Sequence, residues 1–235
     1  LLPIFAAMAQ KKLMRFDAIN HFSNVLQYPE NMAGKWNTFF KNQNSITLEL
    51  ACGKGEYALG LGKMYPHRNF IGVDIKGNRI WKGAKTALDE GLTNIAFLRT
   101  QIDFIDTYFR ENEISEIWIT FPDPQLRNSK QKKRLTHPKF LRLYKKFLSV
   151  DGLIHLKTDS PDLYAFTKET IRIFDLSIIE DEMNIYSNDT LPDELKIKTH
   201  YEKLDISGSK QVFYVCFKID RNLPIEKDLL LKEKV

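Results

Sequence analysis

The sequence is poor in the features that mark exported, membrane-spanning and metal-clustered proteins. It contains only two cysteines, Cys52 and Cys216, too few for a disulfide framework or a zinc cluster. It has no apolar run near the roughly 20 residues that cross a bilayer. We therefore expect a cytoplasmic protein that binds neither a metal ion nor a membrane.

The N-terminus lacks an initiating methionine and the basic segment with which a signal peptide begins. Residues 1–7 are a short apolar stretch. We expect them not to be native, the protein to start at Met8, and no export.

Internal repeats, low-complexity segments and flexible linkers are also missing. Hydrophobic residues make up 43% of the chain and charged residues 28%, the composition of a folded globular protein. We expect one domain at residues 45–220, an extension at residues 1–44 that folds back on it, and a C-terminal tail at residues 221–235.

Short apolar runs alternate with amphipathic segments from residue 46 to residue 158. Five runs predict buried strands, at residues 46–50, 69–75, 95–99, 116–121 and 152–158. Helix signals lie between and after them, at residues 76–90, at a cap on Thr136 followed by Pro138, and at Ser160 and Pro161. This alternation predicts an α/β fold with a parallel sheet and helices on both faces.

Two further strands, at residues 176–181 and 211–219, have no clear helix between them. A pair joined in this way is expected to be antiparallel and to lie at the edge of the sheet, which would then have seven strands. The segment that joins the pair, about residues 182–210, is polar and long. Loops of that length in a compact domain are usually functional.

Acidic residues are absent from one stretch of the chain. Between Arg127 and Lys146 there are nine Lys or Arg residues and no Asp or Glu, although the net charge of the whole chain is only +5. We call residues 127–146 the basic run. Positive charge concentrated in this way favours a polyanionic partner, above all a nucleic acid.

A glycine loop follows the first predicted strand, in Glu49-Leu50-Ala51-Cys52-Gly53-Lys54-Gly55-Glu56. Gly53 and Gly55 allow a tight turn and a close approach of the backbone to a ligand at the carboxyl end of the strand. Asp74 ends the next strand, where a carboxylate can accept hydrogen bonds from ribose hydroxyls. A dinucleotide and S-adenosylmethionine both fit this pattern. Glu49 favours S-adenosylmethionine, because a carboxylate attracts an ammonium group and repels a pyrophosphate.

The fourth strand runs into Phe121-Pro122-Asp123-Pro124, where two prolines restrict the backbone around one acid. We therefore expect Asp123 in a stiff loop beside the cofactor cleft. A polyanion bound at the basic run would present a base to this carboxylate.

Two other groups of polar residues are expected at the same edge. Lys157-Thr158-Asp159 ends the fifth strand, and Asp159 either contacts a ligand or caps the next helix. Thr199-His200-Tyr201-Glu202 brings donors, an aromatic ring and an acid into the long loop. The other histidines lack the spacing of metal ligands and are interpreted as structural.

These motifs, together with Lys132-Lys133-Arg134-Leu135-Thr136-His137-Pro138-Lys139-Phe140-Leu141, resemble those of the bacterial tRNA (guanine-N7-)-methyltransferases in order and spacing. The resemblance covers about residues 24–220, and Phe-Pro-Asp-Pro followed by basic residues is its most specific part. It implies the Rossmann-like fold of class I methyltransferases, S-adenosylmethionine as the methyl donor without a metal, and a guanine in the tRNA variable loop as the acceptor.

Residue by residue, the resemblance implies three roles. The cofactor contacts would be Glu49, Gly53, Gly55, Asp74 and Gln101; the active-site residue would be Asp123; the substrate contacts would be Arg127, Asp159, Thr199, His200, Tyr201 and Glu202. Three positions depart from the family pattern. Gln125 stands where the family usually has Trp, Arg127 where it has Lys, and Gln101 where it has an Asp near the adenine.

Two other functions fit the residues less well. One is a class I methyltransferase that acts on another RNA or on a small molecule. The other is a non-catalytic RNA-binding protein, against which the intact glycine loop, Glu49 and Asp74 argue. The sequence leaves open whether the protein is a monomer or a homodimer.

Overall fold

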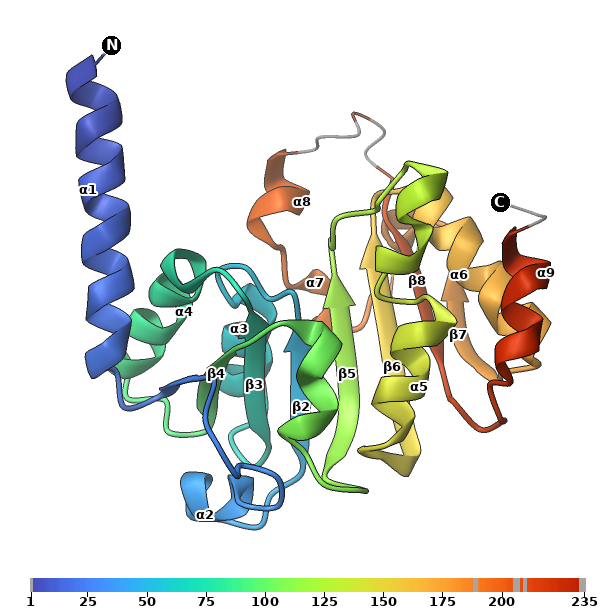
Figure 1. The fold of residues 1–235 in the computed structure, drawn as a ribbon, viewed down its shortest axis with the longest axis horizontal. Coiled ribbons are helices and arrows are strands. Elements are labelled where there is room, and N and C mark those ends of the chain that lie inside the picture. Colours follow the sequence, from blue (N-terminus) through green and yellow to red (C-terminus); the bar gives the residue numbers. More distant parts are fainter. Residues whose placement is uncertain (1, 188–189, 205–207, 209–210, 233–235) are drawn as a thin grey trace.

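The computed structural model describes residues 2–187, 190–204, 208 and 211–232. Within them an eight-stranded sheet runs in the order β1-β4-β3-β2-β5-β6-β8-β7 (Figure 1). The strands are β1 (Val25–Gln27), β2 (Ile46–Leu50), β3 (Asn69–Asp74), β4 (Ile95–Arg99), β5 (Ile114–Thr120), β6 (Leu148–Thr158), β7 (Ile178–Glu182) and β8 (Phe213–Phe217). The five strands expected from residue 46 onward are all present.

Strand direction follows the prediction. The neighbours from β1 to β6 are parallel, whereas β8 pairs antiparallel with β6 on one side and with β7 on the other. The mostly parallel α/β sheet with an antiparallel terminal pair is therefore confirmed. The eighth strand, β1, extends the opposite edge and was not predicted. It has only three half-buried residues, so no apolar run marks it in the sequence.

Helices cover both faces of the sheet. The α-helices are α1 (Leu2–Ala18), α2 (Trp36–Phe40), α3 (Glu56–Met64), α4 (Gly77–Asp89), α5 (Pro138–Lys145), α6 (Pro161–Phe174), α7 (Asp193–Lys196), α8 (His200–Leu204) and α9 (Asp228–Lys232). Side chains of α2, α5 and α6 share one buried cluster with one set of alternating strand residues, while α3 and α4 share a second cluster with the other set. Since neighbouring residues of a strand point to opposite faces, the two clusters lie on opposite sides of the sheet.

Two helix starts were assigned to the right place but only one to the right residue. Ser160 caps α6 by accepting a hydrogen bond from the Leu163 amide, as predicted, so Asp159 is not the cap. His137, not Thr136, caps α5 through a bond from the Lys139 amide to its Nδ1. The Thr136 hydroxyl instead lies 2.7 Å from that of Thr167, where it joins α5 to α6.

The long segment before β8 was expected to lack clear helices, and this was wrong. Its described part contains the 3₁₀ helix η4 (Ile185–Ser187) and the short helices α7 and α8. None exceeds five residues, too few for a periodic apolar pattern to show in the sequence. In Figure 1, α8 lies beyond the carboxyl ends of β2 and β5, and α7 lies close to the end of β5.

The segment before β2 contacts the core through Trp36. Its indole is fully buried, donates a hydrogen bond to the Tyr108 carbonyl at 2.9 Å, and stacks on Phe109 with the ring centroids 5.4 Å apart. Further toward the N-terminus, α1 packs on α4, with Arg15 over the Trp81 ring, and then extends away from the body of the molecule (Figure 1). No helix among the described residues is long and apolar enough to cross a membrane.

The buried His155 on β6 makes the fold sensitive to acid. Its ring stacks on Trp118 with centroids 4.0 Å apart, and its Nδ1 lies 2.8 Å from the Tyr214 hydroxyl. Burial lowers the pKa of His155 to about 3. Below pH 6.5 the His155 side chain therefore binds a proton in the unfolded chain but not in the folded one. The free energy of unfolding consequently falls by about 1.4 kcal/mol for each pH unit.

We expect His155→Phe to lose less stability than wild type between pH 6.5 and pH 4.5, by about 2–3 kcal/mol. Urea unfolding at the two pH values measures this difference. The control is His67→Gln, at an exposed position, which should follow wild type. Equal losses in wild type and His155→Phe would contradict the assignment.

Candidate active site

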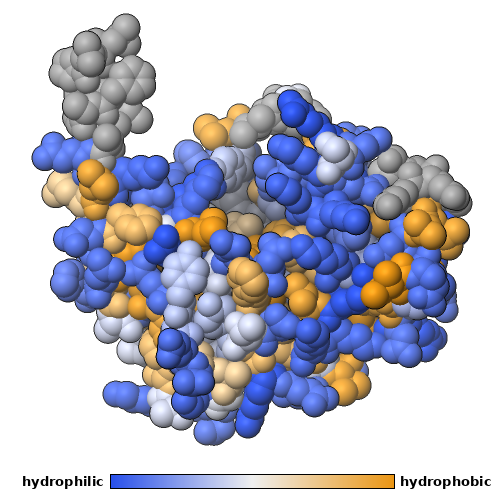
Figure 2. Space-filling view, viewed as in Figure 1, coloured by the Kyte–Doolittle hydropathy of each residue, from blue (hydrophilic) through white to orange (hydrophobic). Residues whose placement is uncertain are grey.

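A cleft of about 760 Å³ opens at the carboxyl edge of the parallel strands. Figure 2 shows the surface hollowed there between hydrophilic side chains. The lining comes from the ends of β2, β3, β5 and β6 and from the loop before α8. It consists of Glu49, Ala51, Cys52, Gly53, Lys54, Glu56, Asp74, Lys76, Arg79, Thr120, Phe121, Pro122, Asp123, Pro124, Leu126, Asp159, Ser160, Pro161, Asp162, Thr199, His200 and Tyr201.

The two loop glycines have different tasks. Both have positive φ, +56° at Gly53 and +72° at Gly55, which favours glycine. A Cβ at Gly55 would lie 2.4 Å from the Phe97 ring, so this residue is needed for packing against the core. A Cβ at Gly53 would meet nothing within 4 Å, because this residue faces the open cleft. Only Gly53 is placed for close approach to a ligand.

Asp74 fixes the shape of the glycine loop. Its Oδ2 accepts a hydrogen bond from the Gly53 amide at 2.9 Å, and its Oδ1 accepts one from the Lys76 amide at 2.8 Å. The carboxylate thereby ties the end of β3 to the loop after β2. Each carboxylate oxygen has a second lone pair, so Asp74 can still accept a bond from a ligand in the cleft.

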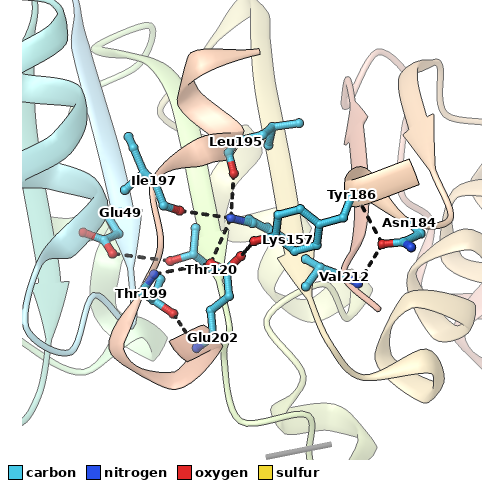
Figure 3. Close-up of polar contacts among 10 residues, drawn as sticks. All are labelled: Glu49, Thr120, Lys157, Asn184, Tyr186, Leu195, Ile197, Thr199, Glu202 and Val212. Atoms are coloured by element: carbon cyan, nitrogen blue, oxygen red, sulfur yellow. Dashed lines mark hydrogen bonds and ion pairs between the residues drawn. The ribbon is translucent and has the colours of Figure 1, made fainter. Parts of the chain in front are cut away.

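Glu49 is a buried carboxylate that has no cation beside it. Its Oε2 accepts a bond from the Ala58 amide at 2.8 Å, and its Oε1 a long one from the Thr120 hydroxyl at 3.4 Å (Figure 3). No ion pair involves Glu49 in the part of the chain that the structure describes. Burial, with a smaller contribution from Glu56, raises the pKa of Glu49 to about 8. At neutral pH Glu49 is therefore largely protonated in the free protein, and a cationic ligand beside it would favour its charged form, whereas a pyrophosphate would not.

The Asp123 loop has a strained backbone. Phe121 and Gln125, on either side of Asp123, have positive φ of 47° and 49° although neither is glycine. Such conformations cost about 1–2 kcal/mol each and persist only where the surroundings enforce them. The Asp123 side chain is exposed to the cleft, and its Oδ1 accepts a bond from the Gln125 amide at 3.0 Å.

The buried side chain of Arg134 stabilises the Asp123 loop by bonding to its backbone. Its Nε donates to the carbonyls of Pro124 and Gln125 at 3.2 and 3.4 Å, and its guanidinium lies 4.6 Å from the centre of the Phe166 ring. Only 2% of this residue is exposed. The stiffness expected from the two prolines thus has a second source, an arginine that the sequence assigned to the basic run.

The structure divides the basic run into two parts. Four of its cations are exposed and form no ion pair or side-chain hydrogen bond with the rest of the described chain: Arg127, Lys130, Lys132 and Lys133, at and within the 3₁₀ helix η3 (Asn128–Lys133). The other five bind groups of the protein itself: Arg134 the loop carbonyls, Lys139 Asp103, Arg142 Asp228, Lys145 the Arg221 carbonyl, and Lys146 Asp106. The acids absent from the run are supplied by distant segments. Within the basic run, the cations that have no partner in the described chain are thus confined to residues 127–133.

Eight of the twelve predicted site residues line the cleft: Glu49, Gly53, Asp74, Asp123, Asp159, Thr199, His200 and Tyr201. Gly55 faces the core. Gln101 is exposed at the start of the 3₁₀ helix η2 (Ile102–Thr107), and Arg127 is exposed just before η3. Glu202 lies behind the lining, against Lys157. The roles inferred for these residues stay predictions.

Four basic residues at or near the cleft were not predicted as site residues. Lys54, Lys76 and Arg79 line the cleft near the ends of β2 and β3, and the Arg79 guanidinium lies 5.8 Å from the centre of the Tyr201 ring. Lys157 is fully buried beneath the long loop. A lysine is seldom fully buried, and its place in the predicted strand 152–158, two residues after a histidine, could have indicated this position.

Comparisons with known proteins agree with this geometry. The model of the family described as "Putative methyltransferase" matches residues 43–215. A tRNA (guanine-N(7)-)-methyltransferase of Christiangramia forsetii is 46% identical over 221 residues, which cover 90% of this chain and 99% of that protein. A protein of the same name from Porphyromonas gingivalis is 47% identical over 208 residues, covering 83% and 84%.

Solved structures with the same fold are more distant in sequence. The 16S rRNA methyltransferase KamB has a TM-score of 0.59 at 12% identity, covering 78% of this chain and 91% of that one. A 30S ribosomal A1408 methyltransferase from an uncultured bacterium has a TM-score of 0.56 at 16% identity, covering 78% and 92%. At this identity the likeness shows the methyltransferase fold alone.

Proposed function

The chain belongs to the tRNA (guanine-N(7)-)-methyltransferase family, and on that premise we propose that it transfers the methyl group of S-adenosylmethionine to N7 of a guanine in the tRNA variable loop. One observation supports the proposal most directly. A buried, uncompensated carboxylate and a stiff exposed one share a cleft, and a segment of free cations begins beside it. A tRNA substrate also accords with the cytoplasmic location that the sequence suggests.

The residues of the cleft fit S-adenosylmethionine. This cofactor supplies an electrophilic methyl group on a positively charged sulfur and carries an ammonium group. Glu49 would balance that positive charge, Gly53 would let the backbone approach, and Asp74 would accept from the ribose hydroxyls. Lys54, Lys76 and Arg79 lie on the same side of the cleft and limit its net negative charge.

Asp123 would orient the guanine. N7 of guanine has an in-plane lone pair and no proton to lose, so the protein needs no general base at this atom. Both oxygens of Asp123 keep a lone pair free and could accept from the N1–H and the exocyclic amine of the base. The carboxylate would then hold the ring in position and stabilise the positive charge that the ring gains on methylation.

The direct test is identification of the product. Unmodified tRNA transcript is incubated with the protein and labelled S-adenosylmethionine, and the nucleosides are separated after digestion. We expect labelled 7-methylguanosine, and none from a transcript whose variable-loop guanine is replaced by adenine. Label in another nucleoside, or equal label in both transcripts, would refute the proposed acceptor.

Asp123→Asn should lose about 100-fold or more in kcat/KM for tRNA, because the amide cannot accept at both positions or stabilise a cation. Affinity for the cofactor should stay nearly unchanged, as judged by calorimetry with S-adenosylhomocysteine. Asp151→Asn, a substitution at an exposed carboxylate, is the control. Turnover within a few-fold of wild type would show that Asp123 has no catalytic role.

The division of the basic run predicts two classes of lysine and arginine. Replacing Arg127, Lys130, Lys132 and Lys133 by Gln should weaken tRNA binding and flatten its salt dependence, by about 0.7–0.9 in slope for each phosphate that is no longer neutralised. Replacing Lys139, Lys145 and Lys146 by Gln should change the slope little. Filter binding between 50 and 300 mM salt measures both, and equal slopes in the two variants would contradict the division.

A further inference from the structure

A lysine ammonium lies buried under the loop that carries Thr199, His200 and Tyr201. Lys157 has no exposed surface, and its Nζ donates to the carbonyls of Leu195 at 2.9 Å and Ile197 at 3.0 Å (Figure 3). Its third bond goes to Glu202 Oε2 at 3.0 Å. All three donors of the ammonium are therefore used, and all three bind one short segment of chain.

Glu202 connects the Lys157 ammonium to Tyr186, which precedes α7, and to Thr199, which follows α7. Its Oε1 accepts from the Tyr186 hydroxyl, and its Oε2 also accepts from the Thr199 amide at 3.3 Å. The Glu202 amide in turn donates to the Thr199 hydroxyl at 3.1 Å. This reciprocal pair of bonds fixes the start of α8 as a capping box does.

Apolar packing cannot fix α8 on its own. No apolar residue of α8 is buried: Leu204 is 55% exposed, and the ring contacts of Tyr201 are with His200 and the Arg79 guanidinium. Preceding it, α7 is held differently: Leu195 is buried, and a Cβ at Gly60 would lie 2.8 Å from the Ile197 side chain. Hydrophobic contacts therefore hold the chain in place as far as Ile197, and the Lys157–Glu202 pair holds it in place beyond that residue.

Neither Lys157 nor Glu202 lines the cleft, whereas Thr199, His200 and Tyr201 do. A buried ion pair has a large desolvation cost, and apolar residues of similar volume often stabilise a fold as well or better. Stability alone therefore does not account for a charged pair at this position. The hydrogen bonds of the pair instead fix the positions of the three lining residues.

We propose that Lys157 and Glu202 are positioning residues that hold Thr199, His200 and Tyr201 at the cleft in the arrangement that receives the guanine. Glu202 then acts through Lys157 rather than by touching the substrate, which replaces the contact expected from the sequence. This proposal rests on the proposed function, because the guanine is the methyl acceptor of that reaction. The anchoring of the segment can be measured without any activity.

The test uses Lys157→Met with Glu202→Gln, which removes both charges and keeps both volumes. Hydrogen exchange of the amides of residues 195–204 should become at least tenfold faster, while exchange in β2, β3 and β5 should not change. Exchange at the wild-type rate in residues 195–204 would overturn the anchoring, whether or not the protein methylates tRNA.

Activity then decides whether the anchoring serves the acceptor. The exposed cations of residues 127–133 are intact in this double variant, so KM for tRNA should stay within threefold of wild type while kcat falls at least tenfold. The dissociation constant of S-adenosylhomocysteine should stay within twofold. A merely structural role would move all three quantities together, and that result, or a wild-type kcat with a mobile segment, would overturn the proposal.

The matched control lies in the same segment. Asp193 and Lys196 form an ion pair whose side chains are 70% and 59% exposed, and pairs of this kind contribute little. Asp193→Asn with Lys196→Met should leave exchange, kcat and KM as in wild type. If wild-type protein forms no 7-methylguanosine, the proposed function has failed, and the exchange measurement still decides the anchoring.

Discussion

The register of the parallel strands determines what can meet at the cleft. Leu50 lies beside Val73 on one side and Ile119 on the other, and Thr120 lies beside Lys157. These strands are buried on both faces, so a slip of one residue would turn core side chains to the wrong face, and the register is strongly fixed. Glu49, Asp74, Asp123 and Asp159 consequently leave the sheet at one edge. Residues 110 positions apart in the sequence, from Glu49 to Asp159, share one cleft because of this pairing.

Charge is divided between the inside and the outside of that cleft. Its lining contains six carboxylates, those of Glu49, Glu56, Asp74, Asp123, Asp159 and Asp162, against three cations. The free cations begin beyond it, at Arg127. An acidic cleft alone would repel RNA phosphates, and a basic one would repel a sulfonium cofactor. With the two signs on neighbouring segments, the backbone of an RNA can be held outside while a base enters.

The sequence predicted those parts of the fold and site that depend on local pattern. Apolar runs revealed the buried strands, and the change from helix to loop connections revealed the antiparallel pair. The glycine loop and the two prolines pointed to the right edge. The parts that it did not predict depend on residues far along the chain. The short strand β1 forms by pairing with β4. Lys139, Arg142 and Lys146 form ion pairs with Asp103, Asp228 and Asp106, respectively. The position of Glu202 is of the same kind, because nothing near residue 202 indicates a lysine 45 positions earlier.

Different interactions hold the two walls of the cleft in place, and this difference suits the proposed reaction. The Asp123 wall is stiff: two prolines, two residues with positive φ and the buried Arg134 all restrict one loop. The wall from Thr199 to Tyr201 depends on one buried ion pair, that of Lys157 with Glu202, and leads into α8, which has no buried apolar residue. A base must be oriented within a fraction of an ångström to react, which requires one rigid reference surface. It must also enter and leave with a bulky RNA attached, which requires that the other surface can yield. The rigid wall carries the proposed catalytic carboxylate, and the other wall carries Thr199, His200 and Tyr201, whose positions depend on the Lys157–Glu202 pair.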